Sequence, residues 1–227
     1  MHVINCIKSS ITSFNGKYAT VKLSGRTLKK NGTWHTLCLP FDLTIAGSAL
    51  ADGTAKVLDN ANTSFASNKL AIKFDAAPAT ISAGTPFIVK WANSGDVITN
   101  PVFTNVAINS ASTTTVDFTG GSFKGNFSPV ALPYGPENLY FGSDNNLYWP
   151  SAGVTVKSNR AYFNLPGATE APNITLDYED DVITGIAGIE NVSSRDNENI
   201  YDLQGRKVEQ PTQKGVYIMN GRKVVIK

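Results

Sequence analysis

The histidines and cysteines, which most often carry acid–base and nucleophilic chemistry, are few and far apart in this sequence. It contains two histidines, His2 and His35, and two cysteines, Cys6 and Cys38. A catalytic triad needs a nucleophile, a base and an orienting group in contact. No Gly-x-Ser-x-Gly motif or cysteine-protease signature accompanies either histidine. His35 lies in an alternating apolar segment, so we expect a packed core histidine, no catalytic residues and no enzyme activity.

The carboxylates do not form a recognisable catalytic or metal-binding pattern. A glycosidase needs two carboxylates about 5–10 Å apart in a cleft, but most acidic residues here lie in predicted turns: Asp52, Asp59, Asp75, Asp96 and Asp144. The one acidic cluster suits a solvated linker, with a calcium site as the alternative, although no EF-hand spacing supports it: Asp177, Glu179, Asp180 and Asp181. The sequence has no CxxC motif for zinc. We therefore expect no metal and no cofactor.

Aromatic residues provide the one positive indication of ligand binding. Four of them fall near predicted strand ends or in loops: Trp91, Tyr134, Tyr148 and Trp149. A sugar ring can stack its apolar face on such a side chain, whose polar tip stays available for hydrogen bonds. Packing in the core of a β protein is the alternative, because aromatic side chains bury a large apolar area.

The two cysteines permit two interpretations. In an exported protein Cys6 and Cys38 could form a disulfide, and closing a loop of about thirty residues would stabilise the fold by about 3–4 kcal/mol. Cys38 lies in an apolar strand, however, and unpaired cysteines are among the most buried residues. The sequence leaves both states open.

Composition favours an extracellular β protein over a nucleic-acid-binding or membrane-spanning one. The charged fraction is 17%, below the typical value of about 25%, and the net charge of +2 lacks the concentrated basic face that nucleic acid requires. Basic residues gather in the tail, where they suit exposed edge strands: Arg206, Lys207, Lys214, Arg222, Lys223 and Lys227. No apolar run approaches the roughly 20 residues of a membrane span. The first residues lack the features of a signal peptide, so we expect a mature form or a fragment.

Short strands at regular spacing predict an all-β fold. Residues 84–91 form a dense apolar strand that suits a central position, and residues 139–141 and 147–149 form a hairpin. The Asn31-Gly32 turn predicts a second hairpin, between residues 23–28 and 34–39. No segment has the pattern of an amphipathic helix. This organisation predicts an antiparallel β-sandwich of jelly-roll or Ig-like type.

The last 28 residues carry the strongest hairpin signal in the chain. Asn220-Gly221 separates two runs of strand-forming residues, 216–219 and 223–226. A type I′ turn needs positive φ at both central residues, which Asn-Gly supplies. A further short strand is expected at residues 200–203, followed by a bend at Gly205. A unit this small cannot bury a large core of its own.

This tail resembles the C-terminal sorting domain of proteins exported by the type IX secretion system of Bacteroidetes. The resemblance rests on IYDLQGRKV, then KGVYI, then NGRKVVIK at the terminus, and covers about an eighth of the chain. It implies that the tail is recognised by the secretion machinery. The matching residues expected to carry this signal are Gly205, Gly215, Tyr217, Gly221, Lys223 and Lys227.

The preceding segment is similar to an uncharacterised module of Bacteroidetes surface proteins that often lies upstream of such a tail. The similarity rests on the order NGTWHTLCLPF, AGTPFIVKW, NPVF, LYFGSDNNLYWP and RAYF. A charge cluster followed by small residues suggests a domain boundary, so we expect a module at 1–180, a linker at 181–194 and the sorting-like domain at 195–227.

The functional expectation is therefore a non-catalytic module of an exported protein, located outside the cell or on its surface. Its expected partners are the secretion machinery and, in the second hypothesis, a glycan. In that hypothesis the chain is a carbohydrate-binding module accessory to polysaccharide degradation. A glycoside hydrolase is the third and least favoured alternative.

Overall fold

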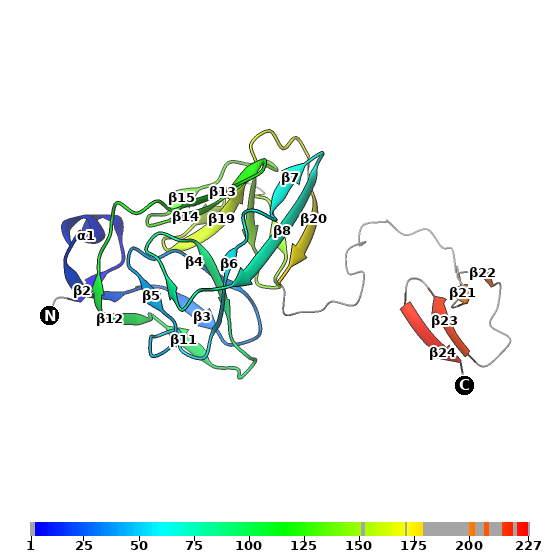
Figure 1. Ribbon diagram of the computed structural model, residues 1–227, viewed down its shortest axis with the longest axis horizontal. Helices are drawn as coiled ribbons and strands as arrows, with labels where there is room; N and C mark the ends of the chain where they lie inside the picture. The colour runs from blue at the N-terminus through cyan, green and yellow to red at the C-terminus, as the bar shows by residue number, and fades with distance from the viewer. Residues whose placement is uncertain are drawn as a thin grey trace. The chain divides into compact units, whose positions relative to one another are not determined.

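The computed structural model describes residues 3–150, 153–170 and 172–178 in full, and the backbone of four strands between residues 200 and 226. The described chain consists almost entirely of short strands, which confirms the predicted all-β class (Figure 1). It divides into two compact units, Met1–Thr184 and Gly185–Lys227. The predicted linker at 181–194 lies outside the described residues.

A sheet in the order β20-β8-β6-β10-β4 runs through the middle of the first unit. Its strands are β4 (His35–Leu37), β6 (Thr54–Leu58), β8 (Lys69–Ala76), β10 (Phe87–Lys90) and β20 (Asn173–Asp177), and β7 (Ser64–Ala66) pairs with β8. β10 pairs antiparallel with both β4 and β6, so the predicted central position of this apolar strand is confirmed. β20 pairs parallel with β8.

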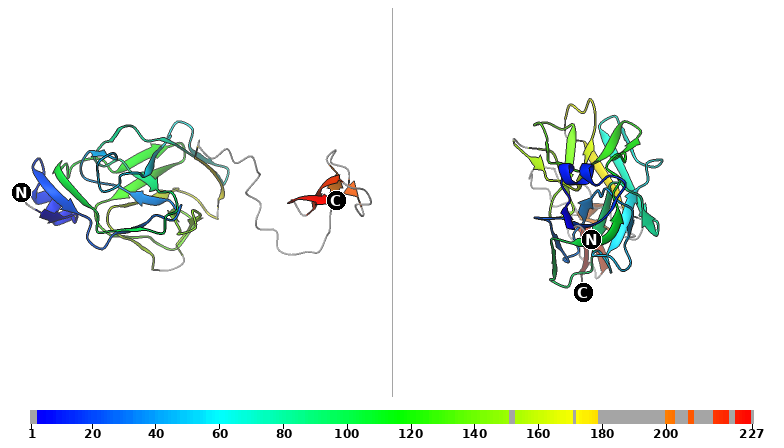
Figure 2. Two further views of the ribbon diagram at one scale, coloured as in Figure 1. Left: turned by 90° about the horizontal axis from the view of Figure 1, so that it is seen from below. Right: turned by 90° about the vertical axis from the view of Figure 1, so that its left-hand side faces the viewer.

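Two further sheets flank this central one (Figures 1 and 2). One has the order β13-β14-β19-β16-β17, with β13 (Thr115–Phe118), β14 (Gly121–Asn126), β16 (Asn138–Phe141), β17 (Leu147–Tyr148) and β19 (Arg160–Asn164). The other has the order β1-β2-β12, with β1 (Val3–Asn5), β2 (Tyr18–Lys22) and β12 (Val102–Ala107). Two-stranded pairs complete the unit: β3 (Thr27–Lys29) with β11 (Val97–Thr99), β5 (Leu43–Thr44) with β9 (Thr80–Ile81), and β15 (Val130–Ala131) with β18 (Thr155–Val156).

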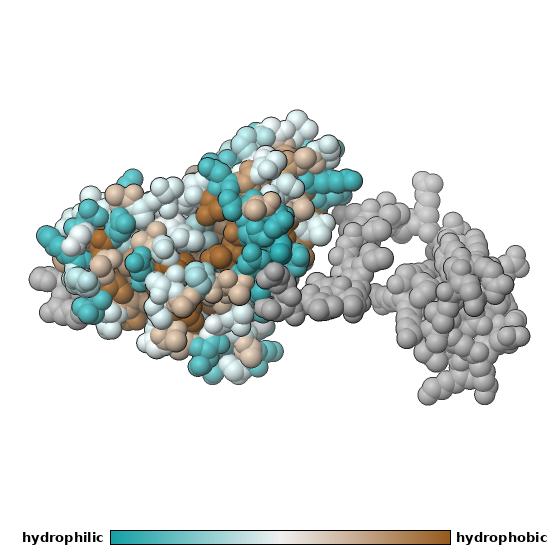
Figure 3. Space-filling model, in the orientation of Figure 1, coloured by the Kyte–Doolittle hydropathy of each residue, from teal (hydrophilic) through white to brown (hydrophobic). Residues whose placement is uncertain are grey.

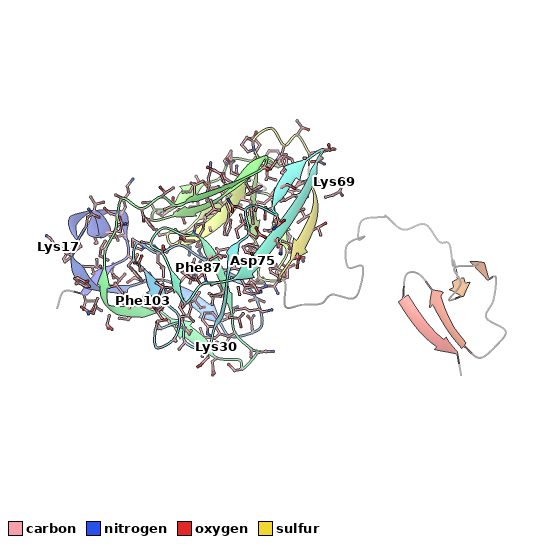
Figure 4. All side chains as sticks on the ribbon, viewed as in Figure 1. Lys17, Lys30, Lys69, Asp75, Phe87 and Phe103 are labelled. Carbon is pink, nitrogen blue, oxygen red and sulfur yellow. The ribbon has the colours of Figure 1, made fainter. Side chains whose placement is uncertain are left out.

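Each face of the central sheet packs on its own hydrophobic core. Successive side chains of a strand point to opposite faces, so Phe87 and Val89 of β10 enter one core and Ile88 enters the other. Phe103 of β12 lies in the same core as Phe87, and Figure 4 labels both. The second core is rich in rings, with Phe163 of β19 stacked on Phe123 of β14 at 4.6 Å between centroids. Burial on both faces explains why β10 is almost wholly apolar.

Two local predictions are wrong. Gly32 has φ +80°, as a turn requires, but the strands on either side do not form a hairpin: β3 pairs with β11 and β4 with β10. β4 buries both Thr36 and Leu37 and ends the sheet beside β10, whereas β3 buries only Leu28. The helix α1 (Lys8–Ser13) was not predicted, because six residues with one buried side chain, Ile11, show no helical periodicity.

The second unit contains a sheet in the order β22-β21-β23-β24. Its strands are β21 (Ile200–Asp202), β22 (Lys207–Val208), β23 (Gly215–Met219) and β24 (Arg222–Ile226), and all pairs are antiparallel. Met219 pairs with Arg222, so two residues connect β23 to β24, as the hairpin prediction requires. The turn residue Gly221 and the predicted signal residues Gly205 and Lys227 lie outside the described residues. Within the described chain, no helix is long and apolar enough to cross a membrane.

Candidate functional site

The hairpin of β16 and β17 presents the exposed aromatic side chains that the sequence indicated. Tyr140 pairs with Tyr148, and Phe141 with Leu147. A single carboxylate organises the loop between the strands: Asp144 Oδ2 accepts hydrogen bonds from the Tyr148 hydroxyl at 2.5 Å and from Asn146 Nδ2 at 2.7 Å. The loop is also tied to the start of β4, because the Trp34 backbone N–H donates to Asn145 Oδ1 at 2.6 Å. The hairpin tip is therefore held in one conformation.

The hydrogen bonds at Asp144 fix its charge state and that of its tyrosine partner. Donation from the Tyr148 hydroxyl, and then from Asn146, lowers the pKa of the Asp144 carboxyl. The same bond to Asp144 raises the pKa of Tyr148. A carboxylate accepting from a neutral phenol is the stable arrangement at neutral pH. The hydrogen bond to Asp144 orients the Tyr148 ring through its hydroxyl group and does not involve the face of the ring.

Three of the four predicted ligand-binding residues are exposed. Tyr148 is 42% exposed, Trp149 45% and Tyr134 78%. Tyr140 and Tyr148 lie with ring centroids 6.3 Å apart and planes tilted by 35°. Among the described residues, no ring contact joins Trp149 or Tyr134 to this pair, so the structure does not show one continuous aromatic platform.

Trp91, the fourth predicted residue, does not belong to a surface site. It is 3% exposed and packs in the first hydrophobic core. Its indole N–H donates to the Ala51 carbonyl at 3.1 Å, which satisfies its one polar atom. Trp91 continues the alternation of Phe87 and Val89 along β10, and this places its side chain on the face that packs in the first hydrophobic core. The prediction of a ligand-stacking role for Trp91 is therefore wrong.

Two hollows adjoin the hairpin and share Thr36, Phe141 and Arg160 in their walls. The larger has a volume of about 240 Å³ and is lined mostly by polar side chains, with two aromatic ones: Thr27, Lys29, Asn31, Thr33, Trp34, His35, Thr36, Phe141, Gly142, Ser143 and Arg160. The smaller, of about 200 Å³, contains Tyr140 and runs along residues 154–157. Figure 3 shows that the face in view is mostly hydrophilic or neutral, with small hydrophobic areas around β4 and β6. Hydroxyls, an amide and cations beside aromatic rings suit a polar ligand with an apolar face.

The two carboxylates that share Lys73 as an ion-pair partner do not have the features of a glycosidase pair. Lys73 Nζ lies 3.6 Å from Asp59 Oδ2 and 3.6 Å from Asp75 Oδ1. A glycosidase needs one acid whose pKa is raised so that it can donate a proton. Here the pKa of Asp59 is lowered, first by the side-chain hydrogen bond from Asn62 and further by Lys73. Within the described residues, no group of three or more His, Cys, Asp or Glu side chains could hold a metal ion.

The histidine and cysteine side chains are engaged in packing. His35 is half-buried and lines the larger hollow, and its Nε2 lies 3.0 Å from both the backbone nitrogen and the carbonyl oxygen of Lys29, so its side chain is engaged but is not fully inside the core as predicted. Cys6 and Cys38 are free and buried. Burial raises the pKa of each thiol to about 12, so neither is a thiolate nucleophile at neutral pH. The Cys6 sulfur instead accepts from Asn159 Nδ2 at 3.1 Å.

Sequence reasoning missed Arg160, the first residue of β19. It lines both hollows beside the hairpin and a third one next to Arg26. In the segment RAYFN the alternation separates Arg160 from the buried Ala161 and Phe163, so its outward direction was predictable. Its position between three hollows depends on how β4, β16 and β18 pack around it. The sequence near Arg160 contains no pattern that predicts this packing.

A comparison of the chain with protein-family models, curated proteins and solved structures found no match.

Proposed function

We propose that this chain is a non-catalytic module of an exported Bacteroidetes protein that acts outside the cell or on its surface. Its last 33 residues would form the signal that the type IX secretion machinery recognises. One observation carries the proposal: the C-terminal strands form an antiparallel sheet within a compact unit, Gly185–Lys227, that is separate from the larger one. A sorting signal needs a recognisable structure that does not depend on its cargo.

The register of this sheet supports the sequence resemblance. Tyr217 of β23 pairs with both Asp202 of β21 and Val224 of β24. The segments IYDLQGRKV, KGVYI and NGRKVVIK therefore come together as neighbouring strands. A secretion receptor could read them as one surface, whereas an irregular tail would present no fixed arrangement.

The test is export in a host that carries type IX secretion. Residues 195–227 are deleted from the chain, which is produced behind a Sec signal peptide, and its location is measured by fractionation and surface proteolysis. We expect the full chain at the surface and the truncated chain in the periplasm. Residues 195–227 fused to a fluorescent reporter should bring the reporter to the surface, and a scrambled tail of the same composition should not. Normal surface delivery of the truncated chain would refute the sorting role.

A second candidate function, glycan binding, rests on the β16–β17 hairpin. Tyr148 and Trp149 are exposed there, and Asp144 orients the Tyr148 ring. Phe141, Gly142 and Ser143 of the same hairpin line a polar hollow of about 240 Å³. An aromatic face next to hydroxyls and amides fits a sugar, whose C–H face stacks while its hydroxyls hydrogen-bond. The ligand of this candidate site would be a polysaccharide accessible from outside the cell.

A glycan array, followed by calorimetry on the best ligand, tests this candidate. Trp149→Ala should weaken binding by roughly 1–3 kcal/mol, using the magnitude of base–aromatic stacking, without changing the melting temperature. Tyr18→Ala is the control, since Tyr18 is also an exposed aromatic residue, at 68%, but lies on β2. If both variants bind as the unaltered chain does, the hairpin is not the glycan site.

A further inference from the structure

Arg26 is a buried cation with unused hydrogen-bond donors. It follows a tight turn in which Gly25 has φ +75° and the Arg26 backbone N–H donates to the Leu23 carbonyl at 3.2 Å. The residue is only 4% exposed. Its Nη2 donates to the Thr36 carbonyl at 2.8 Å, but Nε and Nη1 have no hydrogen-bond partner among the described residues.

Arg26 is one of the residues that line a pocket of about 250 Å³, and the charged lining of this pocket is entirely cationic. Arg160 and Lys157 line it together with Arg26, and Ser158 adds a hydroxyl group, while the Ser24 hydroxyl already donates to Asn5 Oδ1 at 2.6 Å. No aspartate or glutamate lines the pocket. Lys157 is exposed and Arg160 half-buried, so the positive charge extends from the interior to the surface.

The pocket places two positively charged groups, Arg26 and Arg160, close together in a buried region. Burial, and then the charge of Arg160, lowers the pKa of Arg26 to about 9. Burial also lowers the pKa of Arg160. Withdrawing a charge from water is unfavourable unless an opposite charge and hydrogen bonds compensate it. Within the described part of the chain, no carboxylate does so for Arg26.

We propose that this pocket binds an oxyanion, namely a carboxylate, sulfate or phosphate group, between Arg26, Arg160 and Lys157. Such a group offers several acceptor oxygens to the three cationic side chains that line the pocket, in hydrogen bonds that charge makes stronger than neutral ones. The volume is slightly below the about 300–1,000 Å³ typical of small-molecule sites, which suits a small ion or the acidic group of a larger molecule. The inference does not depend on the sorting tail or on the aromatic hairpin.

Thermal unfolding with added anion tests the proposal. The full chain is titrated with sodium sulfate and with sodium phosphate, and sodium chloride at equal ionic strength serves as the reference. Because a ligand that binds only the folded state raises the melting temperature with saturation, we expect a saturating increase with the oxyanions. Sulfate also stabilises proteins non-specifically, so the variants below decide the result.

Arg26→Met is the decisive variant. Replacing an uncompensated buried charge by an apolar side chain is often neutral or stabilising, so we expect this variant to fold and to lose the saturating response, with half-saturation at least ten-fold weaker. Lys69→Gln is the control, since Lys69 lies at the start of β8, is exposed and points outward (Figure 4). Equal responses of the unaltered chain and Arg26→Met would overturn the proposal. If Arg26→Met does not fold, Lys157→Gln replaces it: several-fold weaker half-saturation supports the site, and an unchanged response overturns it.

Two sources of the oxyanion are distinguished by a second set of ligands. Glucuronate, a sulfated oligosaccharide and neutral glucose are compared with inorganic sulfate by calorimetry. Tighter binding of an acidic sugar than of the inorganic ion, lost in Arg26→Met, would identify the acidic group of a polysaccharide. Binding of the inorganic ions alone, also lost in Arg26→Met, would identify a free anion. Binding of glucose equal to that of glucuronate would contradict an oxyanion site.

Discussion

At the scale of single residues, the packing of His35 changes the pKa of its side chain. Its Nε2 lies 3.0 Å from both the backbone nitrogen and the carbonyl oxygen of Lys29, and its ring lies 6.2 Å from that of Trp91. Protonation would let Nε2 donate to the Lys29 carbonyl, but it would leave a charge in a partly buried place beside Arg26 and Arg160. The pKa of His35 is accordingly lowered, first by burial and then by the positive charges of Arg26, Arg160 and Lys29, while the Lys29 backbone opposes this shift.

This shift predicts a pH dependence of stability. Below the unfolded-state pKa of about 6.5, the unfolded chain binds a proton at His35 more readily than the folded chain does. The free energy of unfolding should therefore be highest above that pH and fall as the pH drops toward the folded-state pKa. Urea denaturation at pH 8.0 and 5.5 measures the difference. His35→Gln should reduce the drop, and His2→Gln, at the only other histidine, should retain it. If His2→Gln alone removes the drop, His35 is not its cause.

At the scale of elements, the sheet that contains β14 and β19 lies close to β4 and the residue that follows it. A Cβ added at Gly125 would overlap the Cys38 side chain. On the same side, the Ala161 N–H of β19 donates to Thr36 Oγ1 at 3.1 Å. These contacts join the β14–β19 sheet to the segment that contains β4, and they leave no room for a larger residue at Gly125.

Gly125→Ala should therefore destabilise the fold. Overpacking a dense interior costs about 1–3 kcal/mol, and the expected loss in the free energy of unfolding lies in that range. Cys38→Ala in the same chain removes the overlapping sulfur, so the double variant should lose less than the sum of the single ones. Chemical denaturation of all four chains gives the coupling. Additive losses would show that Cys38 is not the residue that excludes a side chain at Gly125.

At the scale of the whole molecule, the larger unit contains both hydrophobic cores. The first core spans β1, β2, β4, β10 and β12, and the second spans β8, β10, β14 and β19. Every described member of either core lies between Ile4 and Tyr178, inside the larger unit. This unit therefore has extensive apolar burial of its own.

Deletion of residues 185–227 should leave the larger unit folded. We expect a cooperative thermal transition within a few degrees of that of the full chain, because the main driving force, apolar burial, is retained. Differential scanning calorimetry measures the transition, and near-ultraviolet circular dichroism reports the buried aromatic packing. Loss of the transition on truncation would indicate that the tail is a structural part of the larger unit and would weaken the sorting proposal.

The sequence by itself determined the elements whose signals are local. A dense apolar run located β10, and the turn residues between Phe141 and Leu147 located the β16–β17 hairpin. The Asn-Gly pair located the connection of β23 to β24. Each of these depends on side-chain periodicity or turn geometry within a few residues. The jelly-roll or Ig-like topology stays a prediction, as does the sorting role of the tail.

Only the tertiary structure decided which strands pair and what the polar residues between them meet. β20 pairs with β8 although about 100 residues separate Asn173 from Lys69. β3 pairs with β11 and not with β4, the next strand in the sequence. Trp91 and Arg26 resemble surface residues in the sequence, yet both are buried. The strands pair in the arrangement that buries whole apolar faces between segments distant in the sequence. Alternation of apolar and polar residues shows which face of a strand is buried, but it does not show which strand pairs with it.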